Sequence, residues 1–166
     1  MAPLDVRREA LDNVWGFVCT CPRCKEEESM DKKMSALMLD IYESCTEQVA
    51  EDLIGAVESE DRQAVLDVKD QLAAYVELVD AAVAKEGLGP RQTVWLQASL
   101  WQLYELLHHT LEELGQRDLR LTALLQTLSG AVQPGSDSHC RWSRLHLDAV
   151  EEAAAAPPSA PGREGR

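Results

Sequence analysis

Apolar side chains recur every three or four positions along most of this 166-residue sequence, and this spacing constrains the fold more than any other feature. Such a spacing is the period of one face of an α-helix. No segment of comparable length alternates apolar and polar residues as a half-buried strand does. The apolar stripes run from Met34 to Leu53, Val65 to Val83, Leu96 to Leu114, Leu121 to Val132 and, more weakly, Trp142 to Val150. We therefore predict an all-α body of four to five antiparallel helices over residues 30–152.

Glycine and proline residues separate these stripes and predict where the helices end, at 87–90, at Gly115 and at 134–137. The stripe at 90–114 has the widest apolar arc, so we expect it to be one continuous and deeply buried helix. Helices of about 20 residues joined by short turns favour an antiparallel hairpin array similar to tetratricopeptide repeats. The expected organisation is a Cys-rich segment at 1–28, a helical domain at 29–152 and a low-complexity tail at 153–166.

Three cysteines, Cys19, Cys21 and Cys24, form a C-x-C-x-x-C string within a predicted irregular loop at 15–25. Structural zinc takes four ligands, and the string supplies three of them. The fourth ligand comes either from far along this chain or from a segment that the chain does not contain. Alternatives are three free thiols in a turn, or a thiol-disulfide switch that uses Cys21 and Cys24.

The remaining cysteines and histidines do not show ligand spacing. Cys45 lies on an apolar stripe, and we expect Cys45 and Cys140 to be buried apolar residues rather than ligands. No pair among the four histidines follows an H-E-x-x-H pattern. Because the five cysteines are an odd number, a disulfide framework is disfavoured and a reducing compartment, nucleus or cytoplasm, is expected.

The N-terminal residues resemble the post-SET segment of SMYD-like SET-domain protein-lysine methyltransferases. The resemblance rests on the step from Arg7 to Leu11, on Trp15-Gly16-Phe17 and on the cysteine string. It implies that zinc binds the three cysteines and that the fourth ligand is the cysteine of an N-H-x-C motif in a SET core. It also implies that Phe17 packs against the adenine of S-adenosylmethionine and that a helical, tetratricopeptide-like domain follows.

The N-H-x-C motif and the catalytic tyrosine strand of that family do not occur in this sequence. We therefore expect the chain to be the C-terminal portion of such an enzyme and to be inactive alone. In the isolated chain, Phe17 is expected to be a hydrophobic plug between the zinc loop and the helices. The alternative function is a non-catalytic helical scaffold that binds a basic or hydrophobic peptide.

The net charge of −13 is concentrated in residues 25–86, which carry 17 acidic and six basic side chains. These acids are typical of solvated helix exteriors. They also repel phosphate and anionic lipid, so direct nucleic-acid binding is disfavoured, whereas a basic segment such as a histone tail is attracted. No apolar run approaches the ~20 residues that span a bilayer, so we expect no membrane partner. The expected partner is a protein or peptide substrate with a histone or non-histone lysine.

Overall fold

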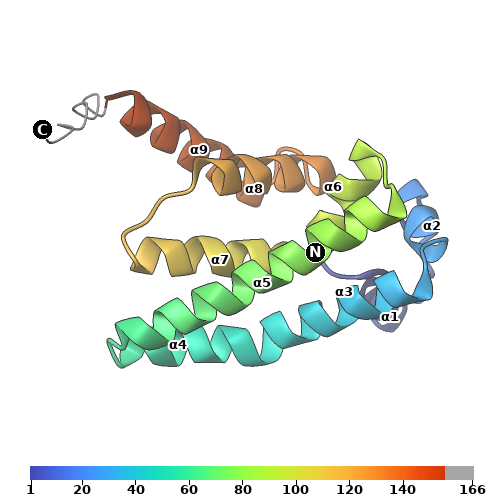
Figure 1. Cartoon of the computed structure of the whole chain (residues 1–166). Coiled ribbons are helices and arrows are strands. Elements are labelled where there is room, and N and C mark those ends of the chain that lie inside the picture. The colour runs from blue at the N-terminus through green and yellow to red at the C-terminus, as the bar shows by residue number, and fades with distance from the viewer. Residues whose placement is uncertain (156–166) are drawn as a thin grey trace, which may run out of the picture.

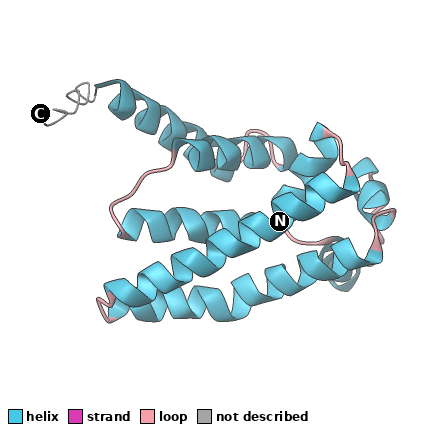
Figure 2. Cartoon of the chain, in the orientation of Figure 1, coloured by secondary structure: helices cyan, strands magenta, loops and turns pink. Residues whose placement is uncertain are grey.

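The computed structural model describes residues 1–155, and within that range every regular element is a helix (Figures 1 and 2). The all-α prediction is therefore confirmed for these residues. The elements are α1 (Leu4–Trp15), α2 (Pro22–Glu28), α3 (Lys32–Ser44), the π-helical turn η1 (Cys45–Val49), α4 (Ala50–Glu58), α5 (Arg62–Glu86), α6 (Pro90–Ser99), α7 (Trp101–Glu113), α8 (Leu119–Val132) and α9 (Asp137–Ala155).

The helix ends follow local capping chemistry. Asp31, Asp61 and Asp118 are N-caps whose carboxylates accept backbone N–H bonds at the start of α3, α5 and α8. Such bonds satisfy donors that the first turn of a helix cannot pair internally. Gly87 ends α5 with a φ of 62°, a left-handed conformation that glycine adopts without strain. The polar and glycine-rich breaks of the sequence therefore fix most of the boundaries.

Neighbouring long helices run in opposite directions (Figure 1). Helices α3, η1 and α4 form one continuous rod, and α5 returns along it, where the hydroxyls of Ser44 and Tyr75 lie 2.9 Å apart. Helix α7 packs on α5, and α8 and α9 form a second hairpin against α6 and α7. The core between these layers is apolar and includes Ile41, Leu72 and Leu125. The stacking of hairpins as in tetratricopeptide repeats stays a prediction.

The expectation of one continuous helix at 90–114 is wrong, because the helix breaks at Leu100, whose φ and ψ are −104° and 30°. The break lets a wide apolar arc contact two sets of partners. Helix α6 packs on α2 and α8, whereas α7 packs on α5 and α8. Six residues of α7 are buried, more than in any other helix described, so burial of this segment is confirmed.

Three further details differ from the sequence-based expectations. The irregular loop is shorter than 15–25, because α2 begins at Pro22, a residue suited to the first helical position. The π-helical turn at Cys45–Val49 gave no sequence signal. Helix α9 continues through Ala155, so the first three residues of the expected 153–166 tail are helical, and residues 156–166 lie outside the described range.

Burial separates the two cysteines outside the string. Cys45 is fully buried, as predicted, whereas Cys140 is exposed on the first turns of α9, so its predicted burial is wrong. Trp142, two residues later, takes the core position of that helix. Within residues 1–155, none of the helices combines the length and apolar character required to cross a membrane.

Candidate metal centre

The three cysteines of the string converge at one end of the molecule. Helix α1 ends at Gly16, whose left-handed φ of 67° turns the chain back towards α2. Cys19 lies in the connecting loop, Cys21 is the N-cap of α2 and Cys24 lies in its first turn. Their Sγ atoms all lie within 4.8 Å of one another. The local fold therefore brings together the three residues that the sequence predicted as ligands.

The donor set fits a thiophilic metal ion such as zinc, because one ion can contact three thiolates that are this close. No other cysteine, histidine, aspartate or glutamate of residues 1–155 joins the group. The described part of the chain therefore supplies three ligands, and a fourth is needed to close a tetrahedral structural site.

The three thiols differ in environment. Cys24 is 3% exposed, Cys19 is half-buried and Cys21 is exposed. The backbone N–H of Cys24, which donates to the Cys21 sulfur, lowers the pKa of the Cys21 thiol. Burial raises the pKa of the Cys24 thiol, and the guanidinium of Arg7, with Nη2 3.6 Å from Cys24 Sγ, opposes this shift. A bound cation would favour the thiolate at all three positions.

A buried charge cluster of Arg7, Arg23, Glu27 and Ser99 lies behind the cysteines. Glu27 is 5% exposed, and its carboxylate accepts bonds from Arg7 Nη1 at 3.0 Å and from Arg23 Nε at 2.8 Å. The hydroxyl of Ser99, from α6, accepts a 2.6 Å bond from Arg23 Nη2 and lies 3.3 Å from Glu27 Oε1. The cluster thus joins the cysteine segment to the helical body.

Sequence reasoning missed Glu27 and Ser99 as residues that support the site. Arg23 and Glu27 are four residues apart, which is the spacing of an ion pair within a helix. The sequence could therefore have predicted this pair. Ser99 lies 72 residues from Glu27 and sits beside the helix break at Leu100, which had no signal. Only the folded chain shows that contact.

A cavity of about 340 Å³ opens beside the cysteines. Arg91 and Trp95 of α6 line its opposite side, and the Arg91 guanidinium stacks 4.1 Å above the Trp95 ring. Arg7 and Arg23 also line this cavity. Its surroundings are therefore cationic, which suits thiolate or other anionic groups near the metal centre.

Four apolar side chains next to the cysteines face solvent, and we call them the exposed strip: Val14, Trp15, Phe17 and Val18. Their exposed fractions are 65%, 68%, 49% and 57%, respectively. The expectation that Phe17 is a plug against the helices is therefore wrong. The glycine turn at Gly16 and the short loop carry these side chains outwards instead.

The alternative of a thiol-disulfide switch has partial support from geometry. Cys21 and Cys24 do open a helix, as redox C-x-x-C pairs do, but residues 1–155 contain no strand beside it. All five cysteines are free thiols. The three-sulfur group, in contrast, uses Cys19 as well, and a metal centre accounts for all three positions.

Comparison of the chain with protein-family models, with curated proteins and with solved structures found no match.

Proposed function

We propose that this chain is the C-terminal part of a SMYD-like protein-lysine methyltransferase, with zinc bound by Cys19, Cys21 and Cys24. In this proposal a SET core packs on the exposed strip and provides the fourth zinc ligand. Phe17 then forms one wall of the S-adenosylmethionine site, and the helical body limits access to the substrate groove. S-adenosylmethionine supplies the methyl group that is transferred to a lysine amine.

The observation that carries the proposal is the exposed strip beside an incomplete set of metal ligands. Several large apolar side chains exposed within five residues of the sequence are typical of an interaction site. A zinc ion with three protein ligands also has one position open to a group from outside the described residues. One neighbouring domain can cover the exposed strip and provide the fourth ligand, since Phe17 and Cys19 are only two residues apart.

The structure of the chain suits a role in closing a site rather than in the chemistry itself. Methyl transfer depends on alignment of the donor and the amine in a closed channel. A single half-exposed phenylalanine can form only one wall of such a channel. Arg23 and Glu27 contact Ser99 of α6, and these contacts hold the segment that carries this wall against α6.

The proposal is tested on the full-length protein that contains this chain, purified through an affinity tag. The assay measures transfer of tritiated methyl groups from S-adenosylmethionine to lysine peptides, including histone tails. We expect transfer to lysine, and we expect Phe17→Ala to raise the KM for S-adenosylmethionine by roughly tenfold, because a ring buried against the cofactor is lost.

The matched control is Leu147→Ala, which truncates a side chain of similar exposure, 59%, on α9. It should leave the KM unchanged. A full-length protein that transfers no methyl group, or an equal effect of the two substitutions, would overturn the proposal.

A further inference from the structure

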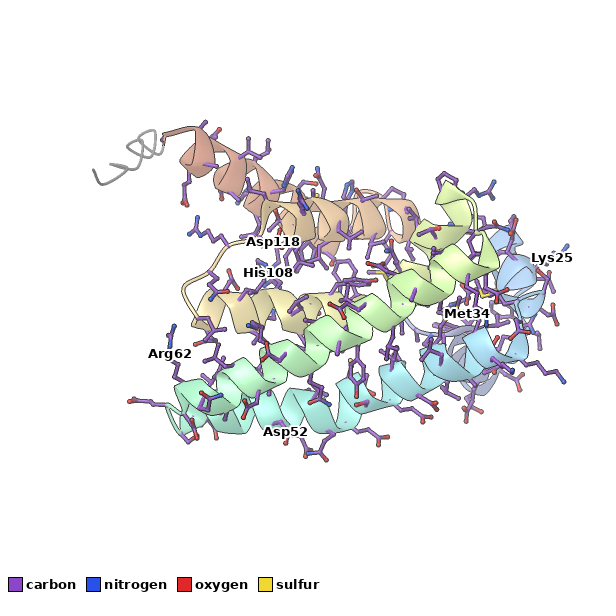
Figure 3. All side chains as sticks on the ribbon, in the orientation of Figure 1. Lys25, Met34, Asp52, Arg62, His108 and Asp118 are labelled. Atoms are coloured by element: carbon purple, nitrogen blue, oxygen red, sulfur yellow. The ribbon has the colours of Figure 1, made fainter. Side chains whose placement is uncertain are left out.

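A second cavity, of about 140 Å³, lies far along the sequence from the cysteines, between α7 and the hairpin of α8 and α9. Its lining combines His108 and Glu112 of α7, the turn at Arg117 and Asp118, and residues of α8 and α9. Figure 3 labels His108 and Asp118 in the space between these helices. Neither the metal centre nor the proposed methyl transfer uses this cavity.

The charges that line the cavity are unbalanced. Four carboxylates, from Glu112, Asp118, Asp148 and Glu152, face one guanidinium, that of Arg117. Arg117 is already paired with Glu152. One oxygen of Asp118 caps α8, so this side chain is held in place by the backbone. The cavity therefore has an excess of negative charge that attracts a cation.

His108 gives an independent indication of a ligand. It is 8% exposed, and its Nε2 atom is buried without a hydrogen-bond partner. Burial is the main cause that lowers the pKa of His108, while Glu112 and Glu105 oppose the shift and His109 and Arg141 add to it. A neutral imidazole carries one nitrogen that accepts a hydrogen bond. Native structures rarely leave such a buried group unpaired.

In the neutral tautomer that carries its proton on Nδ1, His108 Nε2 and the Glu112 carboxylate are two neighbouring acceptors without a donor between them. His108 Nε2 is 3.4 Å from Glu112 Oε1, but this pair makes no hydrogen bond of acceptable geometry. An ammonium group has three N–H donors and a guanidinium has five, so either can bond to both acceptors at once. Leu145 and Ala149 provide apolar lining for the alkyl part of such a side chain.

We propose that this cavity binds the cationic end of a lysine or arginine side chain from a partner polypeptide. The ammonium or guanidinium donates to His108 Nε2 and Glu112, and the carboxylates of Asp148 and Glu152 line the same cavity. This inference does not depend on the proposed methyltransferase function.

The test uses the full 166-residue chain and three blocked pentapeptides, Ala-Ala-X-Ala-Ala, in which X is arginine, lysine or citrulline. Binding is followed by two-dimensional ¹⁵N NMR of the backbone and of the histidine rings. We expect the arginine or lysine peptide to shift the ring nitrogens of His108 and the amides of Thr122 and Ala149. The neutral citrulline peptide should cause no such shifts.

A matched pair of variants separates the cavity from the overall negative charge. Glu112→Gln/Asp148→Asn removes two carboxylates from the cavity, and Asp40→Asn/Glu77→Gln removes two exposed carboxylates from α3 and α5. We expect the first variant to bind the cationic peptide roughly tenfold more weakly and the second to bind as the unchanged protein does.

Three results would overturn the inference. The first is an equal loss of binding in both variants, which would mean nonspecific attraction. The second is equal binding of the citrulline peptide. The third is tighter binding of spermidine than of either cationic peptide, which would assign the cavity to a free polyamine.

Discussion

Removal of the buried carboxylate of Glu27 should destabilise the cysteine segment, because this carboxylate joins Arg7 of α1 to Arg23 of α2. The substitution Glu27→Ala leaves the guanidiniums of Arg7 and Arg23, whose side chains are 17% and 11% exposed, without their shared partner. Breaking a buried ion pair by removing one partner costs about 3–5 kcal/mol, because the remaining charge stays buried and unpaired. Since Glu27 serves two guanidiniums, the upper part of that range is expected.

The substitution should lower the free energy of local unfolding of α1 and α2, because three of the four cluster residues lie in these helices. Only Ser99 belongs to the rest of the helical body. Hydrogen exchange of the α1 and α2 amides measures this opening. A loss of 3–5 kcal/mol corresponds to exchange faster by about two to three and a half powers of ten, up to the limit of the segment's own stability.

Glu28→Ala is the matched control, since Glu28 is the adjacent residue and also pairs with an arginine. Its side chain is 60% exposed and accepts two bonds from Arg8, at 3.1 and 3.0 Å. Water screens an exposed ion pair and leaves it a small net contribution to stability, so exchange should rise only a few-fold. Equal effects of the two substitutions would refute the reasoning that Glu27 is the residue that anchors the segment.

Three further predictions concern the cysteines and the isolated chain. Cys21→Ser should remove bound zinc, as measured by elemental analysis. The far-ultraviolet circular dichroism spectrum should stay unchanged, because the hydrophobic core of α3–α9 does not include the cysteine site. Zinc that stays bound to the variant would contradict the ligand assignment. Alkylation of the folded, zinc-loaded protein, followed by mass spectrometry, should label the exposed Cys140. Cys45 should stay unlabelled up to pH 9, because burial raises the pKa of its thiol to about 12. Labelling of Cys45 in the folded protein would contradict this prediction. The isolated chain should transfer no labelled methyl group from S-adenosylmethionine to histones, because its sequence lacks the N-H-x-C motif and the catalytic tyrosine strand; measurable incorporation would contradict this expectation.

The helices could be predicted because their signals are local. An apolar stripe, a capping aspartate such as Asp61 and a left-handed glycine such as Gly87 act over a few residues, so the sequence alone indicates them. The cysteine group could also be predicted, because Cys19, Cys21 and Cys24 are too close in sequence to lie far apart. These parts of the fold depend little on distant contacts.

The features that the sequence did not predict depend on distant partners. The break at Leu100 divides one apolar arc between two packing surfaces, and neither surface is visible from residues 90–114 alone. Phe17 was expected to be buried because its side chain is apolar, but its exposure follows from the turn at Gly16. The cavity beside His108 needs α7, α8 and α9 in place before its charges meet.

The position of Ser99 at the end of α6 restricts which insertions this chain can tolerate. An added residue inside α6 would turn Ser99 by about 100° around the helix axis and move its hydroxyl away from Arg23 and Glu27. Among natural variants of this protein, length changes should therefore be rare between Pro90 and Ser99.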